Sequence, residues 1–285
     1  MRLIRYGDRD RERLAVLTAP DQALDLSDAL GDLDTILAQG RGLDPVLEFV
    51  AARGDELEPV SLEGVRLGAP LPRPHQILCI GLNFADHARE SGMEPPAEPV
   101  IFNKAPNTLV GPDDAILLPR GHQKVDWEVE LGVVIGRRAR YLERPEDSAA
   151  HIAGYVLVHD VSERVFQLDR GGQWVKGKSC ESFNPCGPYL VTPDELPDRD
   201  RLSMRLWVNG ELFQNGTTAN MIFGVDHLVW YLSQFMVLEP GDLINTGTPA
   251  GVGLGQEPQR FLTVGDVVEL EIDGLGRQRQ VASEA

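Results

Sequence analysis

Short apolar runs that end abruptly in glycine or a charged residue recur along the chain from about residue 75 onward. The three clearest are residues 77–80, 129–135 and 155–158. Runs of this length, rich in Val and Ile, are typical of buried β-strands and are too short for most buried helices. They predict a β-sheet whose central strands are covered on both faces.

A two-residue turn signal, Asn209-Gly210, separates the apolar stretches 206–208 and 212–213. Asn-Gly readily adopts the positive φ angles of tight hairpins, so these stretches are predicted to form a β-hairpin. Residues 264–272 alternate between apolar and polar positions and predict a strand with one exposed face. Residues 221–238 carry apolar residues at helical spacing, and the Pro-Gly pair that follows is expected to end that helix.

The first 70 residues differ in character from the rest of the chain. Residues 14–18 predict a strand and residues 46–51 a short helix, but catalytic residue types do not cluster in this part. Pro70, Pro72 and Pro74 then favour an extended connection. We therefore predict a small N-terminal domain (1–70), a catalytic domain (71–285) and an α+β fold that is mainly β.

The charge and cysteine content narrow the functional classes. The 285 residues include 44 acidic and 27 basic side chains, a formal net charge of −17. Binding to nucleic acid or to an anionic membrane needs a positive field, so neither partner is expected. The three cysteines are an odd number and the chain starts without an apolar signal core, which together predict a reducing, cytoplasmic location.

Carboxylates cluster around the second apolar run. If this run is a strand, Glu128 and Glu130 point to one face while Val129 and Leu131 point to the other. Two adjacent carboxylates repel unless a cation or solvent screens them, so a solvated edge strand is one interpretation. Asp160 ends the next apolar run and favours the other interpretation, a site for an oxygen-preferring ion such as Mg²⁺, Mn²⁺ or Ca²⁺.

His87 and Glu90 stand three residues apart in a segment with helical character, which places them on one helix face. A carboxylate beside an imidazole orients the ring and raises its basicity, as a general base requires. The alternative is a chance pair on a surface helix, and these two residues alone do not decide between the two.

Two glycine-rich segments are candidates for ligand-binding loops. Residues 172–179 match the phosphate-binding P-loop pattern, but prolines follow too closely for the helix that such a loop must open, so this interpretation is rejected. Lys178 within it remains a candidate anion-binding residue. Residues 245–253 could form either a cradle for a carboxylate or an ordinary tight turn.

Taken in order along the chain, these motifs resemble the fumarylacetoacetate hydrolase family. The resemblance spans about residues 75–275 and rests on five ordered segments: Gly81-Leu82-Asn83-Phe84-x-x-His87-x-x-Glu90, Asp126-Trp127-Glu128-Val129-Glu130-Leu131, Asp160-Val161-Ser162, Gly177-Lys178-Ser179 and Thr246-Gly247-Thr248-Pro249-x-Gly251-Val252-Gly253. It implies a mixed β-sandwich roll with a small N-terminal domain, assembled as a homodimer or homotetramer.

The resemblance also implies a role for particular residues. It implies that Glu128, Glu130 and Asp160 bind Mg²⁺ or Mn²⁺. The residues with an implied catalytic role are His87, Glu90 and Lys178. The residues with an implied substrate-binding role are Arg164, Gln167, Gly247 and Thr248.

The implied activity is hydrolysis of the carbon–carbon bond of a small anionic 2,4-dioxo acid to pyruvate and a second acid. The stretch 162–179 is similar to the subgroup that acts on 2,4-diketo-3-deoxy sugar acids, such as the L-rhamnonate derivative. Two alternatives stay open: an oxaloacetate decarboxylase or oxo-acid tautomerase of the same family, and a non-enzymatic protein that binds a metal or ligand.

Overall fold

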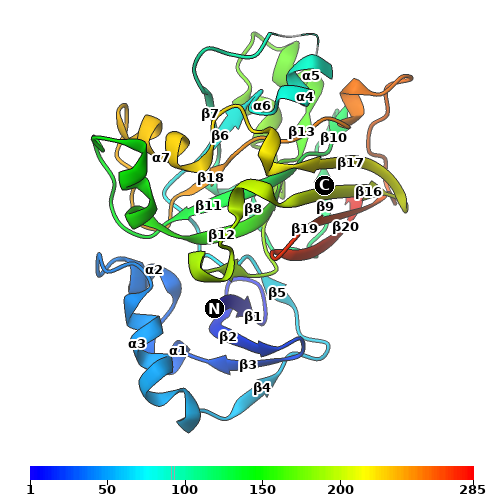
Figure 1. Cartoon of the computed structure of the whole chain (residues 1–285). Coiled ribbons are helices and arrows are strands. Elements are labelled where there is room, and N and C mark those ends of the chain that lie inside the picture. Colours follow the sequence, from blue (N-terminus) through cyan, green and yellow to red (C-terminus); the bar gives the residue numbers. More distant parts are fainter. Residues whose placement is uncertain (91, 93) are drawn as a thin grey trace.

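One long mixed sheet runs through the molecule (Figure 1). The computed structural model describes residues 1–90, 92 and 94–285, and this sheet has eleven strands within them. In spatial order they are β4 (Pro59–Ser61), β3 (Gln22–Asp25), β2 (Arg13–Ala19), β1 (Arg2–Tyr6), β15 (Leu190–Val191), β12 (Ile152–His159), β11 (Val129–Ile135), β18 (Leu243–Asn245), β6 (Ile77–Gly81) and β7 (Val100–Lys104), with β5 (Leu67–Gly68) paired to β1.

A second sheet packs on the central part of the first. Its strands, in spatial order, are β17 (Glu211–Thr217), β16 (Ser203–Val208), β19 (Val267–Ile272), β20 (Gly276–Glu284) and β9 (Ile116–Leu118). Val129 and Leu131 of β11 lie in one buried apolar cluster with Leu206 of β16 and Leu270 of β19. This sheet-on-sheet core confirms the predicted α+β, mainly β sandwich.

The opposite face of the long sheet is covered by short helices near its N-terminal end. Val134 of β11 and Val156 of β12 share a second buried cluster with Ile36 and Val46. The last two residues belong to α2 (Leu33–Leu37) and α3 (Asp44–Arg53). The other helices are α1 (Ser27–Leu30), α4 (Ala85–Glu90), α5 (Arg164–Leu168), α6 (Val175–Lys178) and α7 (Val225–Ser233), and α7 packs in the first buried cluster. No helix in the described part of the chain has the length and apolar character needed to cross a bilayer.

Short 3₁₀ helices and two-residue strands complete the fold. The 3₁₀ helices are η1 (Gly54–Glu56), η2 (Pro106–Thr108), η3 (Pro145–His151), η4 (Pro193–Glu195), η5 (Arg199–Arg201), η6 (Thr218–Asn220) and η7 (Gly253–Gly255). The short strands are β8 (Leu109–Val110), β10 (Val125–Asp126), β13 (Ser162–Glu163) and β14 (Asn184–Pro185), which pair as β10–β13 and β8–β14.

Most elements predicted from the hydrophobic pattern are confirmed. The strands at residues 14–18, 77–80 and 155–158 lie within β2, β6 and β12, the strand at 129–135 is β11, and the helix at 46–51 lies within α3. The predicted hairpin is β16–β17, and its turn residues Asn209 and Gly210 have φ angles of 52° and 80°. Positive φ at both positions is the backbone of a type I′ turn.

Two predicted elements are shorter than the pattern suggests. The helix expected over 221–238 is α7 alone, because the backbone N–H of Ile222 bonds Asn83 and Met221 forms a β-bridge with Phe84. The strand expected over 264–272 begins at residue 267, since Gly265 turns the chain with φ of 91°.

The solvated edge strand proposed as one interpretation of the glutamate pair is wrong. β11 lies between β12 and β18, and every residue of β11 is buried. Glu130 belongs to this strand and Glu128 precedes it directly. Their carboxylates are therefore interior groups that need partners.

The leading residues extend the sheet that carries these strands. β1 pairs with β15, whose Val191 pairs in turn with Tyr155 of β12. Apolar residues before and after residue 70 also share the second buried cluster. The division of the chain into domains near residue 70 stays a prediction.

Candidate active site

Strand alternation brings three carboxylates together at one end of the long sheet. Val129 and Leu131 point into the sandwich core, so Glu130 points to the other face. Asp160 follows β12, and its backbone N–H donates to the carbonyl of Glu128 at 3.0 Å. Carboxylate oxygens of Glu128, Glu130 and Asp160 all lie within 4.8 Å of one another, and all three side chains are buried.

Two lysines partly neutralise this cluster. Lys178, from α6, donates to Glu128 Oε2 and to Asp160 Oδ2, each at 2.8 Å. Lys104, from β7, is fully buried and pairs with the other oxygen of Asp160. Burial opposes charge on Lys178, but the attraction of Asp160 and Glu128 outweighs it and raises the pKa of the ammonium above its usual value. Lys178 is therefore a fixed cation.

Glu128 and Glu130 differ in their electrostatic surroundings. Burial favours the neutral form of both, yet Lys178 and Arg164 hold the pKa of Glu128 below its ordinary value. Burial, followed by repulsion from Asp160 and Glu128, raises the pKa of Glu130 well above its ordinary value. Within the described residues, Glu130 accepts one hydrogen bond, from the Gly247 N–H at 2.9 Å, and has no ion-pair partner.

This donor set fits a divalent metal ion. Three carboxylates with no cysteine or histidine ligand are the oxygen donors that Mg²⁺ and Mn²⁺ prefer. The buried carboxylate of Glu130 also lacks the counter-charge that its neighbours have, and a cation among the three would supply it.

Arg164 lies at the floor of the same site. Its Nε donates to Asp126 Oδ2 at 2.8 Å, and its Nη1 donates to Gln167 Oε1 at 3.1 Å. Its Nη2 forms an ion pair with Glu128 Oε1 at 2.8 Å, although it makes no hydrogen bond of regular geometry among the described residues. Arg164 and Gln167, one turn apart on α5, therefore present N–H groups to a ligand.

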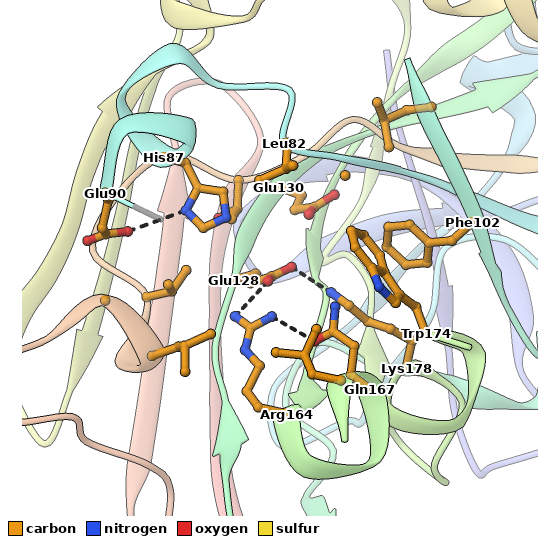
Figure 2. Close-up of a pocket in the computed structure, with 17 residues that line it drawn as sticks. Leu82, His87, Glu90, Phe102, Glu128, Glu130, Arg164, Gln167, Trp174 and Lys178 are labelled. Atoms are coloured by element: carbon orange, nitrogen blue, oxygen red, sulfur yellow. Dashed lines mark hydrogen bonds and ion pairs between the residues drawn. The ribbon is translucent and has the colours of Figure 1, made fainter. Parts of the chain in front are cut away.

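His87 and Glu90 form the predicted pair on α4, with His87 Nδ1 3.3 Å from Glu90 Oε2. An ionised carboxylate can only accept, which places the proton on Nδ1; the other ring nitrogen has no hydrogen-bond partner among the described residues and can act as a base. The second oxygen of Glu90 accepts the Gly251 N–H at 2.9 Å. Figure 2 shows the imidazole between Glu90 and the two glutamates of the cluster.

The glycine-rich loop after β18 supports the carboxylates from behind. The N–H of Gly247 is used by Glu130, and the Thr248 hydroxyl donates to the Val129 carbonyl at 2.9 Å. Gln214 Nε2 donates to the same hydroxyl at 2.8 Å. The Gly247 N–H and the Thr248 hydroxyl proton are thus already donated within the protein. The substrate-binding role predicted for these two residues would have to use other atoms of the loop.

A cavity of about 360 Å³ joins the dyad to the carboxylates (Figure 2). Eight of the ten residues predicted for the site line it, whereas Asp160 and Gly247 lie behind the surface. The lining residues are Ile80, Gly81, Leu82, His87, Glu90, Phe102, Glu128, Glu130, Arg164, Gln167, Leu168, Trp174, Lys178, Thr248, Val252, Leu254 and Gly255.

Two groups that shape the site were not singled out from the sequence. Asp126 accepts hydrogen bonds from Arg164 and from the backbone N–H groups of Gly253 and Leu254, so it joins the floor to the glycine-rich loop. Lys104 pairs with Asp160 from the end of β7, a strand that begins with three apolar residues. Asp126 belongs to one of the five ordered sequence motifs, whereas Lys104 lies in none of them.

Comparison with known proteins finds a family model and relatives that cover most of the chain. Residues 76–282 match the model of the fumarylacetoacetate (FAA) hydrolase C-terminal family. A protein of Burkholderia ambifaria (strain MC40-6) that carries the provisional name hydrolase is 46% identical, over 98% of each chain.

Two solved structures share the fold over essentially their whole length. A maleylpyruvate hydrolase from Sphingobium sp. SYK-6, in complex with manganese (II) ion and pyruvate, is 28% identical with a TM-score of 0.82, covering 100% of both chains. A probable 2-hydroxyhepta-2,4-diene-1,7-dioate isomerase from Mycobacterium abscessus is 32% identical with a TM-score of 0.83, covering 100% of this chain and 99% of its own. Sequence, fold and site geometry agree, and the chain belongs to the fumarylacetoacetate hydrolase family.

Proposed function

We propose that this protein is a divalent-metal-dependent hydrolase that cleaves a 2,4-dioxo acid between carbons 3 and 4, giving pyruvate and a second acid. The observation that carries the proposal is one cavity that joins an imidazole–carboxylate dyad to three clustered carboxylates. A base beside a metal-type site is what addition of water to a carbonyl needs, followed by loss of an enolate.

The polar side of the cavity suits the dioxo acid core. Glu128, Glu130 and Asp160 would hold Mg²⁺ or Mn²⁺, which when bound supplies positive charge close to the oxygens of the substrate. Arg164 Nη2 and the amide of Gln167 offer N–H groups to the substrate carboxylate. Lys178 stabilises negative charge on the pyruvate part as it develops.

His87 provides the proton transfer. Its free ring nitrogen takes a proton from water, whose oxygen attacks carbon 4, while Glu90 holds the ring and stabilises the imidazolium. The bond between carbons 3 and 4 then breaks, and its electron pair passes into the enolate of pyruvate. Return of the proton from His87 to carbon 3 completes pyruvate and restores the base.

The test follows pyruvate release from 2,4-dioxo acids with Mg²⁺ and with EDTA. We expect release that requires metal, and His87→Ala should lower kcat by about 10² to 10⁴-fold, the usual share of a general base. Arg138→Ala, at an exposed residue that does not line the cavity, is the control. Metal-independent release, or full activity of His87→Ala, contradicts the proposal.

The alternative within the family is decarboxylation or tautomerisation of an oxo acid, and the similarity to an isomerase keeps it in view. These reactions do not add water, so oxaloacetate belongs in the same substrate panel. Pyruvate from oxaloacetate alone, retained in His87→Ala, would favour this alternative. The homodimer or homotetramer, the small oxo-acid partner and the sugar-acid substrate implied by the family resemblance remain predictions.

A further inference from the structure

We infer that the group on carbon 4 of the substrate is apolar, an alkyl or aryl group, and not a polyhydroxylated chain or a second carboxylate. The inference rests on the proposed function and departs from the sugar acid suggested by the sequence. It comes from the cavity wall beyond the carboxylate-binding groups, where seven large apolar side chains line the space: Ile80, Leu82, Phe102, Leu168, Trp174, Val252 and Leu254.

The polar groups of the described lining are almost all engaged. Both oxygens of Glu90 are used by His87 and Gly251, and Lys178 holds Glu128 and Asp160. Arg164 Nη2, which is ion-paired with Glu128, and the amide nitrogen of Gln167 donate no hydrogen bond within the described residues and remain for a ligand, and both lie next to the carboxylate cluster. Hydroxyl groups further out would find few partners.

Two further polar residues of the cavity wall, Thr248 and His87, also offer few groups to a substrate hydroxyl. The Thr248 hydroxyl donates to Val129 and accepts from Gln214. The free nitrogen of His87 is the proposed base. A substrate hydroxyl that moves from water to an apolar wall loses its hydrogen bonds to water, which is unfavourable. Moving a second carboxylate there costs more free energy, because the group is charged.

One wall is a fixed aromatic surface. The rings of Phe102 and Trp174 meet edge to face with their centroids 5.3 Å apart, and the Lys178 ammonium lies 5.0 Å from the Phe102 centroid. Trp174 also packs directly on Gly81, where an added Cβ would lie 2.6 Å from its ring. Figure 2 shows both rings on the side of the site opposite His87. These contacts fix both rings as one apolar wall before any ligand binds.

Leu82 adds to the apolar wall from a costly backbone position. It follows Gly81 with φ of 54°, a left-handed conformation that leucine rarely adopts. A strained residue whose side chain lines the cavity is best explained by what that side chain contacts there. Leu168, 44% exposed, continues the apolar surface outward.

The experiment compares kcat/KM, with Mg²⁺, for 2,4-dioxoheptanoate, its 5,6-dihydroxy derivative and 2,4-dioxoheptanedioate. The first two differ only in two hydroxyl groups, and we expect the unsubstituted acid to be cleaved about 10 to 100-fold more efficiently. Equal or better cleavage of either polar substrate overturns the inference while leaving the hydrolase intact. Release of pyruvate from none of the three would instead refute the proposed function, and this inference with it.

A variant series tests the wall itself. Trp174→Ala should lower the ratio of kcat/KM for 2,4-dioxoheptanoate to that for 2,4-dioxopentanoate about 10-fold, because the longer chain makes more contact with the ring. Leu254→Ala, in η7 directly after the glycine-rich loop, should lower the same ratio and serves if the tryptophan variant does not fold. Phe235→Ala, an aromatic residue that is 63% exposed and outside the cavity, is the control. A ratio unchanged in both wall variants contradicts the inference.

Discussion

At the scale of single residues, the site is a buried charge cluster with one carboxylate in excess. Asp126, Glu128, Glu130 and Asp160 face three buried cations, and each of them except Glu130 has a cationic partner. An unpaired buried carboxylate is unfavourable by several kcal/mol unless it binds a proton or a cation. Under the metal binding proposed above, Glu130 would therefore couple the stability of the fold to occupancy of the site.

Glu130→Gln should separate the destabilising effect of the unpaired carboxylate from its contribution to metal binding. In EDTA the variant is expected to be more stable than the wild type by about 1 to 3 kcal/mol, because the amide keeps the bond from Gly247 and removes the repulsion. Added Mg²⁺ should raise the melting temperature of the wild type more than that of the variant, since binding stabilises the folded state by mass action.

The measurement is a thermal melt of each protein across a Mg²⁺ titration. Glu239→Gln, at an exposed carboxylate paired with Arg138, is the control and should follow the wild type. A Glu130→Gln variant that is less stable in EDTA, yet gains as much from Mg²⁺ as the wild type, would show that Glu130 is not a ligand.

The positions of some site residues could be predicted and others could not. Alternation within a strand places Glu128 and Glu130 on one face, and helical spacing pairs His87 with Glu90, because these are local rules. The ion pair of Lys104 with Asp160 joins residues 56 positions apart. Such a contact depends on how the strands are arranged in the sheet, and the local sequence pattern carries no information about that arrangement.

At the scale of elements, the carboxylate of Glu90 links α4 to the glycine-rich loop. Glu90 holds His87 with one oxygen and the Gly251 N–H with the other, and its side chain presses on Gly255. A Cβ built on Gly255 would lie 2.3 Å from the Glu90 carboxyl carbon. The small residue at 255 thus leaves room for Glu90 beside a segment that lines the cavity.

Gly255→Ala should lower kcat about 10 to 100-fold, because displacing Glu90 by even an ångström misaligns the base. The backbone at 255 lies outside the left-handed region, so alanine is tolerated there apart from the clash. Adding Glu90→Asp, with its shorter side chain, should recover part of the activity, which a general folding defect would not. Gly224→Ala, where an added Cβ meets nothing within 4 Å, is the control.

The lengths of elements show where local pattern reaches its limit. β11 matches its predicted bounds because seven consecutive buried residues determine them. α7 starts four residues later than its apolar spacing suggests, because residues 221–223 bond instead to Asn83 and Phe84 at the entry to α4. Hydrogen bonds to a distant segment thus replace the helical hydrogen bonds of these residues, and the hydrophobic pattern cannot predict that replacement.

At the scale of the whole molecule, charged contacts help to tie the leading strands to the catalytic part. Arg66, just before β5, donates to Asp114 at 2.6 and 2.9 Å and to Glu12 at 2.9 Å. Asp114 lies between β8 and β9 and also accepts the Gly111 N–H. Burial raises the pKa of Asp114, but the bonds from Arg66 outweigh it and leave this pKa below its ordinary value.

Asp114→Asn should therefore reduce stability in a pH-dependent way. A carboxyl whose pKa is lowered by folding contributes stability above its unfolded pKa, roughly 3.9, and loses it as the pH falls through the lower folded value. Near pH 7 we expect the variant to be about 1 kcal/mol less stable, a modest amount because solvent reaches the pair. Chemical denaturation from pH 7 to 3 should show this gap constant down to about pH 5 and shrinking below 4. Asp21→Asn, at an exposed turn carboxylate, should show little gap, and a gap for Asp114→Asn that widens in acid would contradict the assignment.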